Sequence, residues 1–423
     1  MAKIKKITAR EILDSRGVPT IEGRLILDDE KEVTAIASSG ESKGKYERVE
    51  LRDQDQERYN GLGVKKAISY INNLIGPKLI GVSPEKQADI DYWLMLADGS
   101  ENSSQLGVNV LMTVSQLVFK AAAVQKNLPL YKYFNFLYND FFKKNLPIEK
   151  IPAPIFCLIN GGKHGTKNLE FQEFQIIPST SFSFSSSLQL GVEIYHSLKE
   201  VLDYRNAGTT VSEEGGFAPN LLTNIDGLEI IRETLLQEKK QLGVDIFLGL
   251  DLAASHYYKN GKYTIKDRPS PLSINEYIEY LINLNKEYSL LLLEDPIEEE
   301  DFESWKKIND KLGNNTYLVG DDFVAGNKKR LLRAINEKAA SVIVIKFNSV
   351  STISEMLEFI NLCKEANLKI IFSQRMGETN DSIIADFAMA IQADFVKFGA
   401  PVRGERVAKY NRLLEIEEEI NRN

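Results

Sequence analysis

The second half of the chain repeats a short apolar run that ends in a charged residue, and this rhythm constrains the fold strongly. Six runs follow it, at residues 246–251, 290–294, 317–321, 342–346, 369–375 and 395–397. Between them, stretches such as 273–285 and 351–366 place apolar residues at helical spacing. A regular alternation of strand and helix is the repeating unit of a parallel α/β barrel. A doubly wound sheet is the competing architecture, but it favours a glycine-rich phosphate turn after its first strand, which is absent here.

The charged ends of these runs fall into two groups. Three acidic ends precede three basic ones, in the order Asp251, Glu294, Asp321, Lys346, Arg375 and Lys397. Because the C-terminal ends of barrel strands line the active-site mouth, we expect a carboxylate cluster on one side and a cationic wall on the other. Converging carboxylates repel one another unless a hard cation such as Mg²⁺ joins them, and a cationic wall suits an anionic substrate. The alternative is that these residues form salt bridges with one another.

The first part of the chain has a different pattern. Residues 4–9, 20–27 and 32–37 are expected to be strands, and a polar, glycine-containing loop follows at 38–44. Helical spacing then dominates from about residue 62 to 135. We place a domain boundary near residue 140, which gives a small α+β domain over 1–140 and the barrel over 141–423.

Composition limits the possible partners and compartments. The chain has 423 residues with 52 basic and 60 acidic side chains, a formal charge of −8, which disfavours non-specific nucleic-acid binding. Its two cysteines lie in apolar runs, so we expect a reducing compartment rather than a disulfide framework. Charged residues interrupt the N-terminal segment, and we expect neither a signal peptide nor a membrane span. These features predict a cytoplasmic protein with a small-molecule partner.

Two loops carry further polar residues of interest. Residues 212–220 place Glu213 and Glu214 before two glycines, and residues 160–165 hold His164, one of only three histidines. Taken alone, paired acids in a loop are usually solvated, and a lone loop histidine usually lies on the surface.

Short motifs in both halves resemble those of the enolase (phosphopyruvate hydratase) family. In chain order they are ILDSRG at 12–17, ELRD at 50–53, NGG at 160–162, QEF at 172–174, EGGFAPN at 214–220, EDP at 294–296, GDD at 320–322, GET at 377–379 and GAP at 399–401. They follow the family order and cover nearly the whole chain. The resemblance implies an eight-stranded barrel whose first strands depart from simple alternation, preceded by a smaller α+β domain.

The same resemblance implies an activity and assigns roles to residues. The expected reaction is dehydration of 2-phosphoglycerate to phosphoenolpyruvate with two Mg²⁺ ions. Asp251, Glu294 and Asp321 are similar to the ligands of the first ion, and Ser42 to a residue that helps hold the second. Lys346 resembles the base that removes the proton next to the carboxylate, and Glu214 the acid that assists departure of hydroxide. The substrate-contacting positions are matched by His164, Gln172, Glu173, Arg375 and Lys397. A homodimer, with a higher oligomer as an alternative, is also implied.

This mechanism agrees with simple charge chemistry. Removing a proton alpha to a carboxylate builds a second negative charge, which metal ions stabilise. Hydroxide is a poor leaving group unless an acid protonates it.

Several positions depart from the family motifs on the lid and the phosphate side. The mobile loop reads SGESKG at 39–44, and the segment at 373–379 reads SQRMGET, with Gln374 and Met376 where the family has His and Ser. Phe398 and the sequence FNS at 347–349 also differ. An alternative is therefore a diverged homologue that acts on a related carboxylate or phosphonate. A third is a non-catalytic binding protein.

Overall fold

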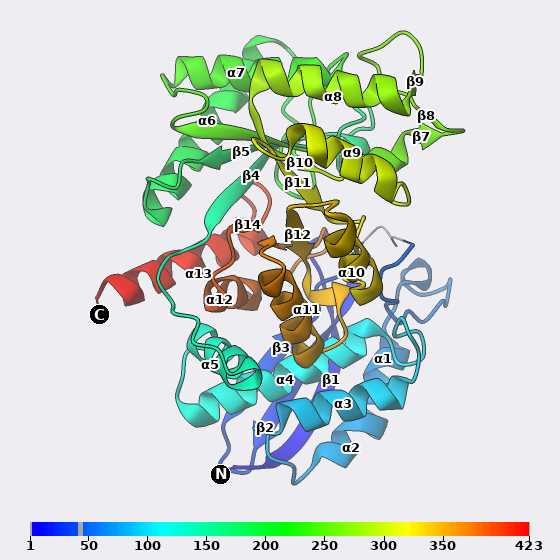
Figure 1. Cartoon of the computed structure of the whole chain (residues 1–423). Coiled ribbons are helices and arrows are strands. Elements are labelled where there is room, and N and C mark those ends of the chain that lie inside the picture. The colour runs from blue at the N-terminus through cyan, green and yellow to red at the C-terminus, as the bar shows by residue number, and fades with distance from the viewer. Residues whose placement is uncertain (1, 41–44, 423) are drawn as a thin grey trace. The chain divides into compact units, whose positions relative to one another are not determined.

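The computed structural model describes residues 2–40 and 45–422, which form two compact units built from interleaved parts of the chain. The first unit contains residues 1–150, 345–365 and 374–392, and the second contains 151–344, 366–373 and 393–423. Figure 1 shows the elements along the chain. The predicted boundary near residue 140 remains a prediction, since the first unit also takes in two later segments.

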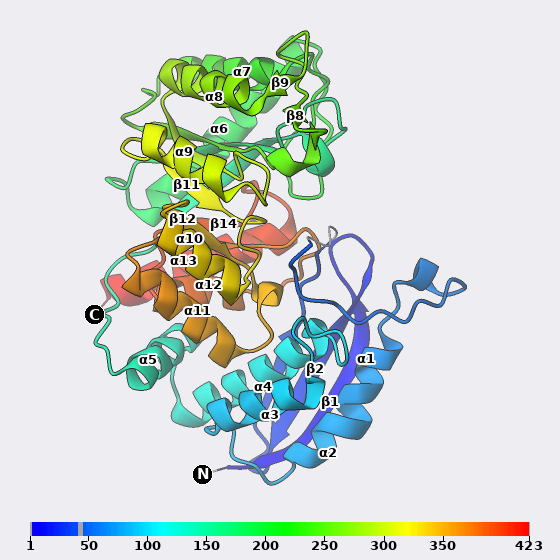
Figure 2. The same ribbon diagram turned by 45° about the vertical axis from the view of Figure 1, so that its right-hand side comes forward.

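The first unit is an antiparallel sheet covered by helices. Its strands β1 (Ile4–Leu13), β2 (Pro19–Leu27) and β3 (Glu32–Ile36) pair in that order. Helices α1 (Lys65–Tyr70), α2 (Gly76–Leu79), α3 (Gln87–Asp98), α4 (Val108–Lys126) and α5 (Leu130–Phe142) follow, with a π-helical turn at Ile71–Ile75. In Figure 2, α4 lies along β2 within this unit, and the contacts agree. The three predicted strands are present, and β1 is longer than predicted because its pairing with β2 continues to Leu13, next to the turn at Asp14.

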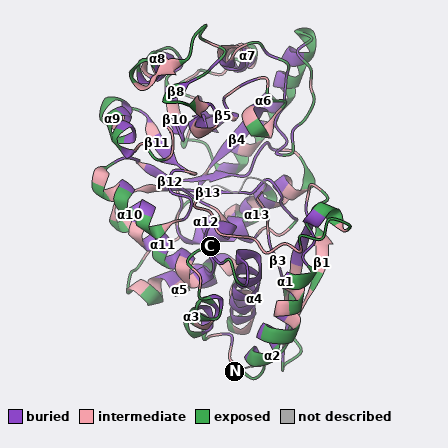
Figure 3. Ribbon diagram, turned by 90° about the vertical axis from the view of Figure 1, so that its right-hand side faces the viewer, coloured by how far each residue is buried: buried purple, intermediate pink, exposed green. Residues whose placement is uncertain are grey.

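The packing of α4 on β2 explains one glycine. A Cβ atom on Gly23 would lie 2.7 Å from side-chain atoms of both Leu117 and Thr113, so the strand can approach the helix only without a side chain there. Helix α4 meets the length and hydropathy expected of a membrane span, with a mean hydropathy of 1.3 over Val108–Gln125, a feature that the sequence analysis did not anticipate. However, 89% of that window is buried, which is typical of the core helix of a globular unit, and Figure 3 shows α4 largely in the buried colour.

Helices α11 (Ile353–Glu365) and α12 (Ile383–Ala390) complete the first unit from the far end of the chain. Buried Asp91 on α3 joins α11 to it, because its carboxylate accepts hydrogen bonds from the Ser115 hydroxyl at 2.6 Å and the Ser354 backbone N–H at 2.9 Å. Burial raises the pKa of Asp91. Tyr138 likewise donates to Asn361 at 3.2 Å.

The second unit is built around a closed eight-stranded barrel, as predicted. Around the barrel the strands follow the order β10-β11-β12-β13-β14-β4-β5-β6. Their bounds are β4 Ala153–Asn160, β5 Glu173–Pro178, β6 Ile246–Asp251, β10 Leu290–Glu294, β11 Tyr317–Gly320, β12 Val342–Ile345, β13 Lys369–Ser373 and β14 Phe395–Lys397. Strand β5 runs antiparallel to both β4 and β6, so the barrel begins with the expected departure from alternation.

Helices and a small sheet occupy the connections of this unit. The helices are α6 (Phe184–Tyr204), α7 (Asn224–Gln237), α8 (Ile274–Tyr288), α9 (Phe302–Leu312), α10 (Lys328–Glu337) and α13 (Gly404–Asn421). The sheet consists of β7 (Tyr258–Lys259), β8 (Lys262–Tyr263) and β9 (Leu272–Ser273).

The two-residue period of a strand links the barrel core to its charged end. A buried apolar cluster includes Ile177, Leu292, Val319 and Phe395. Alternate side chains of a strand share a face, so the residue two positions after a core residue also faces inward. These residues are Glu294 on β10, Lys397 on β14 and Asp321 just past β11. The apolar layer thus supports a charged one.

Candidate active site at the barrel end

Buried charged residues from four strands meet at one end of the barrel. Glu173 opens β5, Asp251 closes β6, Glu294 closes β10 and Lys397 closes β14. In the strand register Asp251 lies opposite both Glu173 and Glu294. All four side chains are buried. Since β5 is antiparallel, its first residue lies at the same end as the last residues of the others.

Lys397 lies among the carboxylates rather than in a separate cationic wall. Its Nζ atom is 2.8 Å from each carboxylate oxygen of Glu294, 3.3 Å from Glu173 Oε2 and 3.6 Å from Asp251 Oδ2. Burial alone would lower its pKa, but the surrounding carboxylates raise it well above the ordinary lysine range. The expectation of a cationic wall is therefore wrong for Lys397, and the salt-bridge alternative applies to it.

Two of these carboxylates are crowded even with Lys397 present. Burial raises the pKa of Asp251 to about 8, and the charges of Glu173 and Asp295 add to this effect while Lys397 opposes it. The pKa of Glu294 is also raised well above its usual value by burial and by Asp251. Gln172 donates its side-chain N–H to Asp251 Oδ2 at 3.1 Å. Lys397 therefore does not suffice to keep all of these buried carboxylates ionised, and a divalent cation bound among them would favour their charged form.

Asp321 follows β11 directly and is positioned through Asp295. The Asp295 carboxylate accepts backbone N–H bonds from Asp321 at 3.0 Å, Asp322 at 2.8 Å and Phe323 at 3.4 Å. Asp295 has a left-handed backbone, with φ 41°. Burial and the neighbouring charges of Asp322 and Asp321 raise its pKa.

Acidic ligand atoms lie close enough for a cation in two groups. Across the part of the chain that the structure describes, the ligand atoms of Asp295, Asp321 and Asp322 lie within 4.8 Å of one another, as do those of Cys157, Glu173 and Glu214. The predicted set of Asp251, Glu294 and Asp321 is not such a group in this arrangement, in which Lys397 contacts two of its members. Its donors are nevertheless all carboxylate oxygens, the ligands that Mg²⁺ prefers, so the residues fit the ion.

A second cluster forms around His164, which follows β4 in a short 3₁₀ turn. Its Nδ1 atom lies 3.0 Å from Glu214 Oε2 and 3.3 Å from Glu173 Oε1. Burial opposes protonation, but the two carboxylates prevail and raise the pKa of His164 to about 10. His164 therefore belongs to the polar cluster rather than to an open surface.

Asn160 and Ser212 fix the loop that carries Glu214. The Asn160 amide donates to Glu214 Oε2 at 3.3 Å and accepts from the Ser212 hydroxyl at 2.7 Å. A Cβ atom on Gly216 would lie 2.3 Å from Asn160 Oδ1, so a glycine is needed for this close approach. The loop around Glu214 is thus built into the fold and is not a solvated acidic run.

Lys346 and Arg375 belong to the first unit and follow barrel strands in the chain. Lys346 comes directly after β12, and Arg375 two residues after β13. Within that unit the Arg375 guanidinium donates to both carboxylate oxygens of Glu47, at 2.8 and 3.0 Å. Gln374 and Met376 beside it are buried. Ser42 lies outside the described residues, as do Glu41 and Lys43.

Sequence reasoning missed several residues of these clusters, among them Asp295, Glu47 and Cys157. Asp295 lay inside a recognised motif and directly after a strand-end acid, a signal that could have identified it. Glu47 contacts Arg375 from 328 positions away, and Cys157 lay in an apolar run, so neither gave a local signal.

Comparison with protein families agrees with this architecture. The model described as the enolase N-terminal domain matches residues 4–134. The model described as the enolase C-terminal TIM barrel domain matches residues 148–423. The two matches cover nearly the whole chain, and they coincide with a small sheet domain and a closed eight-stranded barrel. With its acidic clusters at the barrel end, this chain is a member of the enolase family, whose domains indicate a lyase of the enolase superfamily.

Proposed function

We propose that the protein is a Mg²⁺-dependent hydro-lyase that removes the proton alpha to a carboxylate and eliminates water, converting 2-phosphoglycerate to phosphoenolpyruvate. The observation that carries this proposal is the buried group of Glu173, Asp251 and Glu294 around Lys397 at the barrel end. Such a group is costly to bury without a further cation to balance it.

The metal would be held by oxygen ligands. Asp251, Glu294 and Asp321 are the proposed ligands of the first Mg²⁺, and Ser42 is proposed to help hold a second. Bound Mg²⁺ would stabilise the negative charge that develops on the substrate carboxylate. Asp295 supports this role by holding the backbone of Asp321 in place.

Proton transfer is assigned to two residues on different loops. Lys346, directly after β12, is the proposed base that takes the alpha proton on its Nζ atom. Glu214 is the proposed acid that gives a proton from its carboxyl group to the departing hydroxide. Asn160 and His164 orient the Glu214 carboxyl through the contacts described above. Separating base and acid in this way lets each act on its own side of the substrate.

Substrate recognition is assigned to the remaining polar residues. The substrate is a small anion with a carboxylate and a phosphate, contacted by His164, Gln172, Glu173, Arg375 and Lys397. Arg375 suits a phosphate because its planar guanidinium can bind two oxygens at once. No nucleic acid or membrane is part of this proposal.

A second candidate is a diverged enolase that acts on a related carboxylate or phosphonate. It is favoured by two observations on the phosphate side. Met376 has no side-chain donor for a phosphate oxygen, and the Arg375 guanidinium already donates two hydrogen bonds to the Glu47 carboxylate. Either feature would weaken the binding of a highly charged phosphate.

One assay distinguishes the candidates. The purified protein is incubated with 2-phosphoglycerate and Mg²⁺, and phosphoenolpyruvate is followed by its ultraviolet absorbance. Turnover at an ordinary enolase rate supports the first candidate. Mg²⁺ binding with weak or absent turnover supports the second, and it directs the search to other carboxylates. A protein with no Mg²⁺-dependent thermal shift and no turnover would be a non-catalytic binding protein, which contradicts both.

We also propose that the enzyme acts as a two-fold symmetric homodimer in the cytoplasm, with a higher oligomer as the alternative. The two cysteines are free and buried, which is compatible with a reducing compartment. Light scattering at micromolar concentration tests the dimer, which a monomer mass would contradict.

A further inference from the structure

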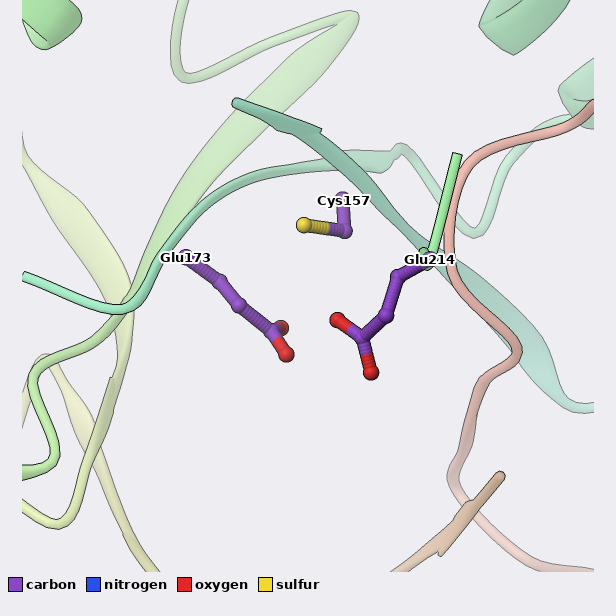
Figure 4. A group of neighbouring side chains, drawn as sticks. All are labelled: Cys157, Glu173 and Glu214. Atoms are coloured by element: carbon purple, nitrogen blue, oxygen red, sulfur yellow. The ribbon is translucent and has the colours of Figure 1, made fainter. Parts of the chain in front are cut away.

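A thiol lies beside two carboxylates at the barrel end. Cys157 is on β4, Glu173 opens β5, and Glu214 lies in the loop that Asn160 holds. Sγ and one oxygen from each carboxylate lie within 4.8 Å of one another, and all three residues are buried. Figure 4 shows the two carboxylates turned toward each other, with the thiol of Cys157 beside them.

A nitrogen ligand is directed at the same carboxylates. His164 Nδ1 is itself buried and makes no hydrogen bond of good geometry, although it lies 3.0 Å from Glu214 and 3.3 Å from Glu173. Lys397 also faces the cluster, but its 2.8 Å contacts to Glu294 are shorter than its 3.3 Å contact to Glu173. The cluster therefore brings together two carboxylates, a thiol and an imidazole nitrogen that makes no hydrogen bond within the described residues.

This donor set differs in kind from the carboxylates proposed for Mg²⁺. Thiolate and imidazole select borderline and soft cations such as Zn²⁺ and Cd²⁺, whereas Mg²⁺ takes oxygen ligands. We propose that Cys157, Glu173 and Glu214 form a Zn²⁺ site, with His164 as a further ligand candidate. Binding forms an Sγ–metal bond and releases the Sγ proton to solvent.

Occupation of this site has a functional consequence that rests on the proposed function. The ion would use the carboxylates of Glu214, the proposed acid, and Glu173, a proposed substrate contact. Zn²⁺ at this site therefore inhibits the Mg²⁺-activated enzyme by withdrawing these groups from the substrate. Cys157 makes the site selective for Zn²⁺ over Mg²⁺, because it supplies the thiolate ligand of the set.

The binding test uses Cd²⁺ as a spectroscopic substitute for Zn²⁺, and it needs no substrate. The thiolate-to-Cd²⁺ charge-transfer absorbance is titrated in the full-length protein, in Cys157→Ser and in Cys363→Ser. Cys363 is the matched control, since it is a buried cysteine on α11. We expect a saturable band in the wild type and in Cys363→Ser, no band in Cys157→Ser, and persistence of the band at saturating Mg²⁺. A band retained in Cys157→Ser, absent from the wild type or abolished by Mg²⁺ overturns the proposal.

A second variant covers the case in which Cys157→Ser does not fold. Glu173→Gln keeps the thiol but removes an anionic ligand, so its Cd²⁺ affinity should fall at least about tenfold. Glu193→Gln, an exposed substitution on α6, should leave the affinity unchanged. Equal Cd²⁺ affinity in Glu173→Gln and Glu193→Gln would also contradict the site.

Inhibition of turnover by Zn²⁺ is measured in a separate experiment. At saturating Mg²⁺, Zn²⁺ should inhibit the wild type and Cys363→Ser, and Cys157→Ser should need at least about tenfold more Zn²⁺ for half-inhibition. Identical inhibition of all three proteins removes the inhibitory role of the site. A protein without any turnover contradicts the proposed function, whereas the absorbance titration still decides whether the Zn²⁺ site exists.

Discussion

Asp295 holds the backbone of Asp321: a carboxylate oxygen of Asp295 accepts the Asp321 N–H at 3.0 Å, and its other oxygen accepts the N–H of the next residue at 2.8 Å. The buried carboxylate thus fixes the direction in which the chain leaves β11. It also places a second carboxyl group next to a proposed metal ligand without being one of the proposed ligands itself.

We expect Asp295→Ala to weaken Mg²⁺ binding by about tenfold or more and to lower the free energy of unfolding by about 2–4 kcal/mol, because buried N–H groups lose their acceptor. Asp295→Asn should fall between the wild type and Asp295→Ala. Calorimetric Mg²⁺ titration and chemical denaturation measure the two effects. The exposed variant Asp310→Ala is the control. Unchanged Mg²⁺ affinity in Asp295→Ala would show that Asp321 needs no such support.

The proposed base and acid should be separable by isotope exchange. Lys346→Ala should bind ligand but lose exchange of the alpha proton with deuterated water, whereas Glu214→Gln should keep exchange and lose elimination. Each should reduce turnover by at least about a hundredfold. Proton exchange is followed by NMR with 2-phosphoglycerate and Mg²⁺. Rapid deuterium incorporation by Lys346→Ala would reverse the assignment.

Two histidines should show opposite pH effects on stability. The pKa of His164 is raised to about 10, so its ion pairs stabilise the fold below pH 6.5, and that contribution is lost as pH rises toward 10. Burial lowers the pKa of His256 to about 4, so this residue destabilises the fold as pH falls from 6.5 to 4. His164→Gln should therefore cost most stability near pH 6 and least near pH 10. His256→Gln should be least harmful at acid pH. Denaturant titrations across this range test both, and parallel pH profiles would contradict the assignment.

The phosphate side should respond to restored donors. Met376→Ser together with Gln374→His should strengthen 2-phosphoglycerate binding by about ten- to a hundredfold, since a hydrogen bond to a charged group contributes roughly 1.5–3 kcal/mol. Single substitutions separate the two contributions, and KM and kcat for 2-phosphoglycerate are the readout. If the wild type already turns over this substrate like an ordinary enolase, the altered-substrate candidate is wrong.

The part of the fold that follows from local pattern was predictable from sequence. Strand alternation sets Glu294 two positions beyond a core leucine, and the run that ends at Lys397 has the same form, so the charged barrel end could be identified without coordinates. The family resemblance supplied a departure from simple alternation at the start of the barrel, and only the structure shows that this departure is the antiparallel strand β5.

Contacts across the barrel were not predictable in the same way. A strand pattern shows that Lys397 points inward, but whether it joins the acids or stands apart depends on side-chain packing after the barrel closes. The partnership of Arg375 with Glu47 depends likewise on two segments that only the folded first unit brings together. The order of charged residues along the chain therefore predicts which residues form a site better than it predicts which of them pair with one another.

The three-segment construction of the first unit has a consequence for biosynthesis. Residues 1–150 leave the ribosome early, but Asp91 and Tyr138 find their partners Ser354 and Asn361 only after about 200 more residues have been translated, roughly 10–40 s at ordinary elongation rates. Until then the surfaces of α3 and α5 that receive α11 remain uncovered on the nascent chain. The N-terminal segment therefore waits in an incomplete form during synthesis, with these surfaces open to chaperones.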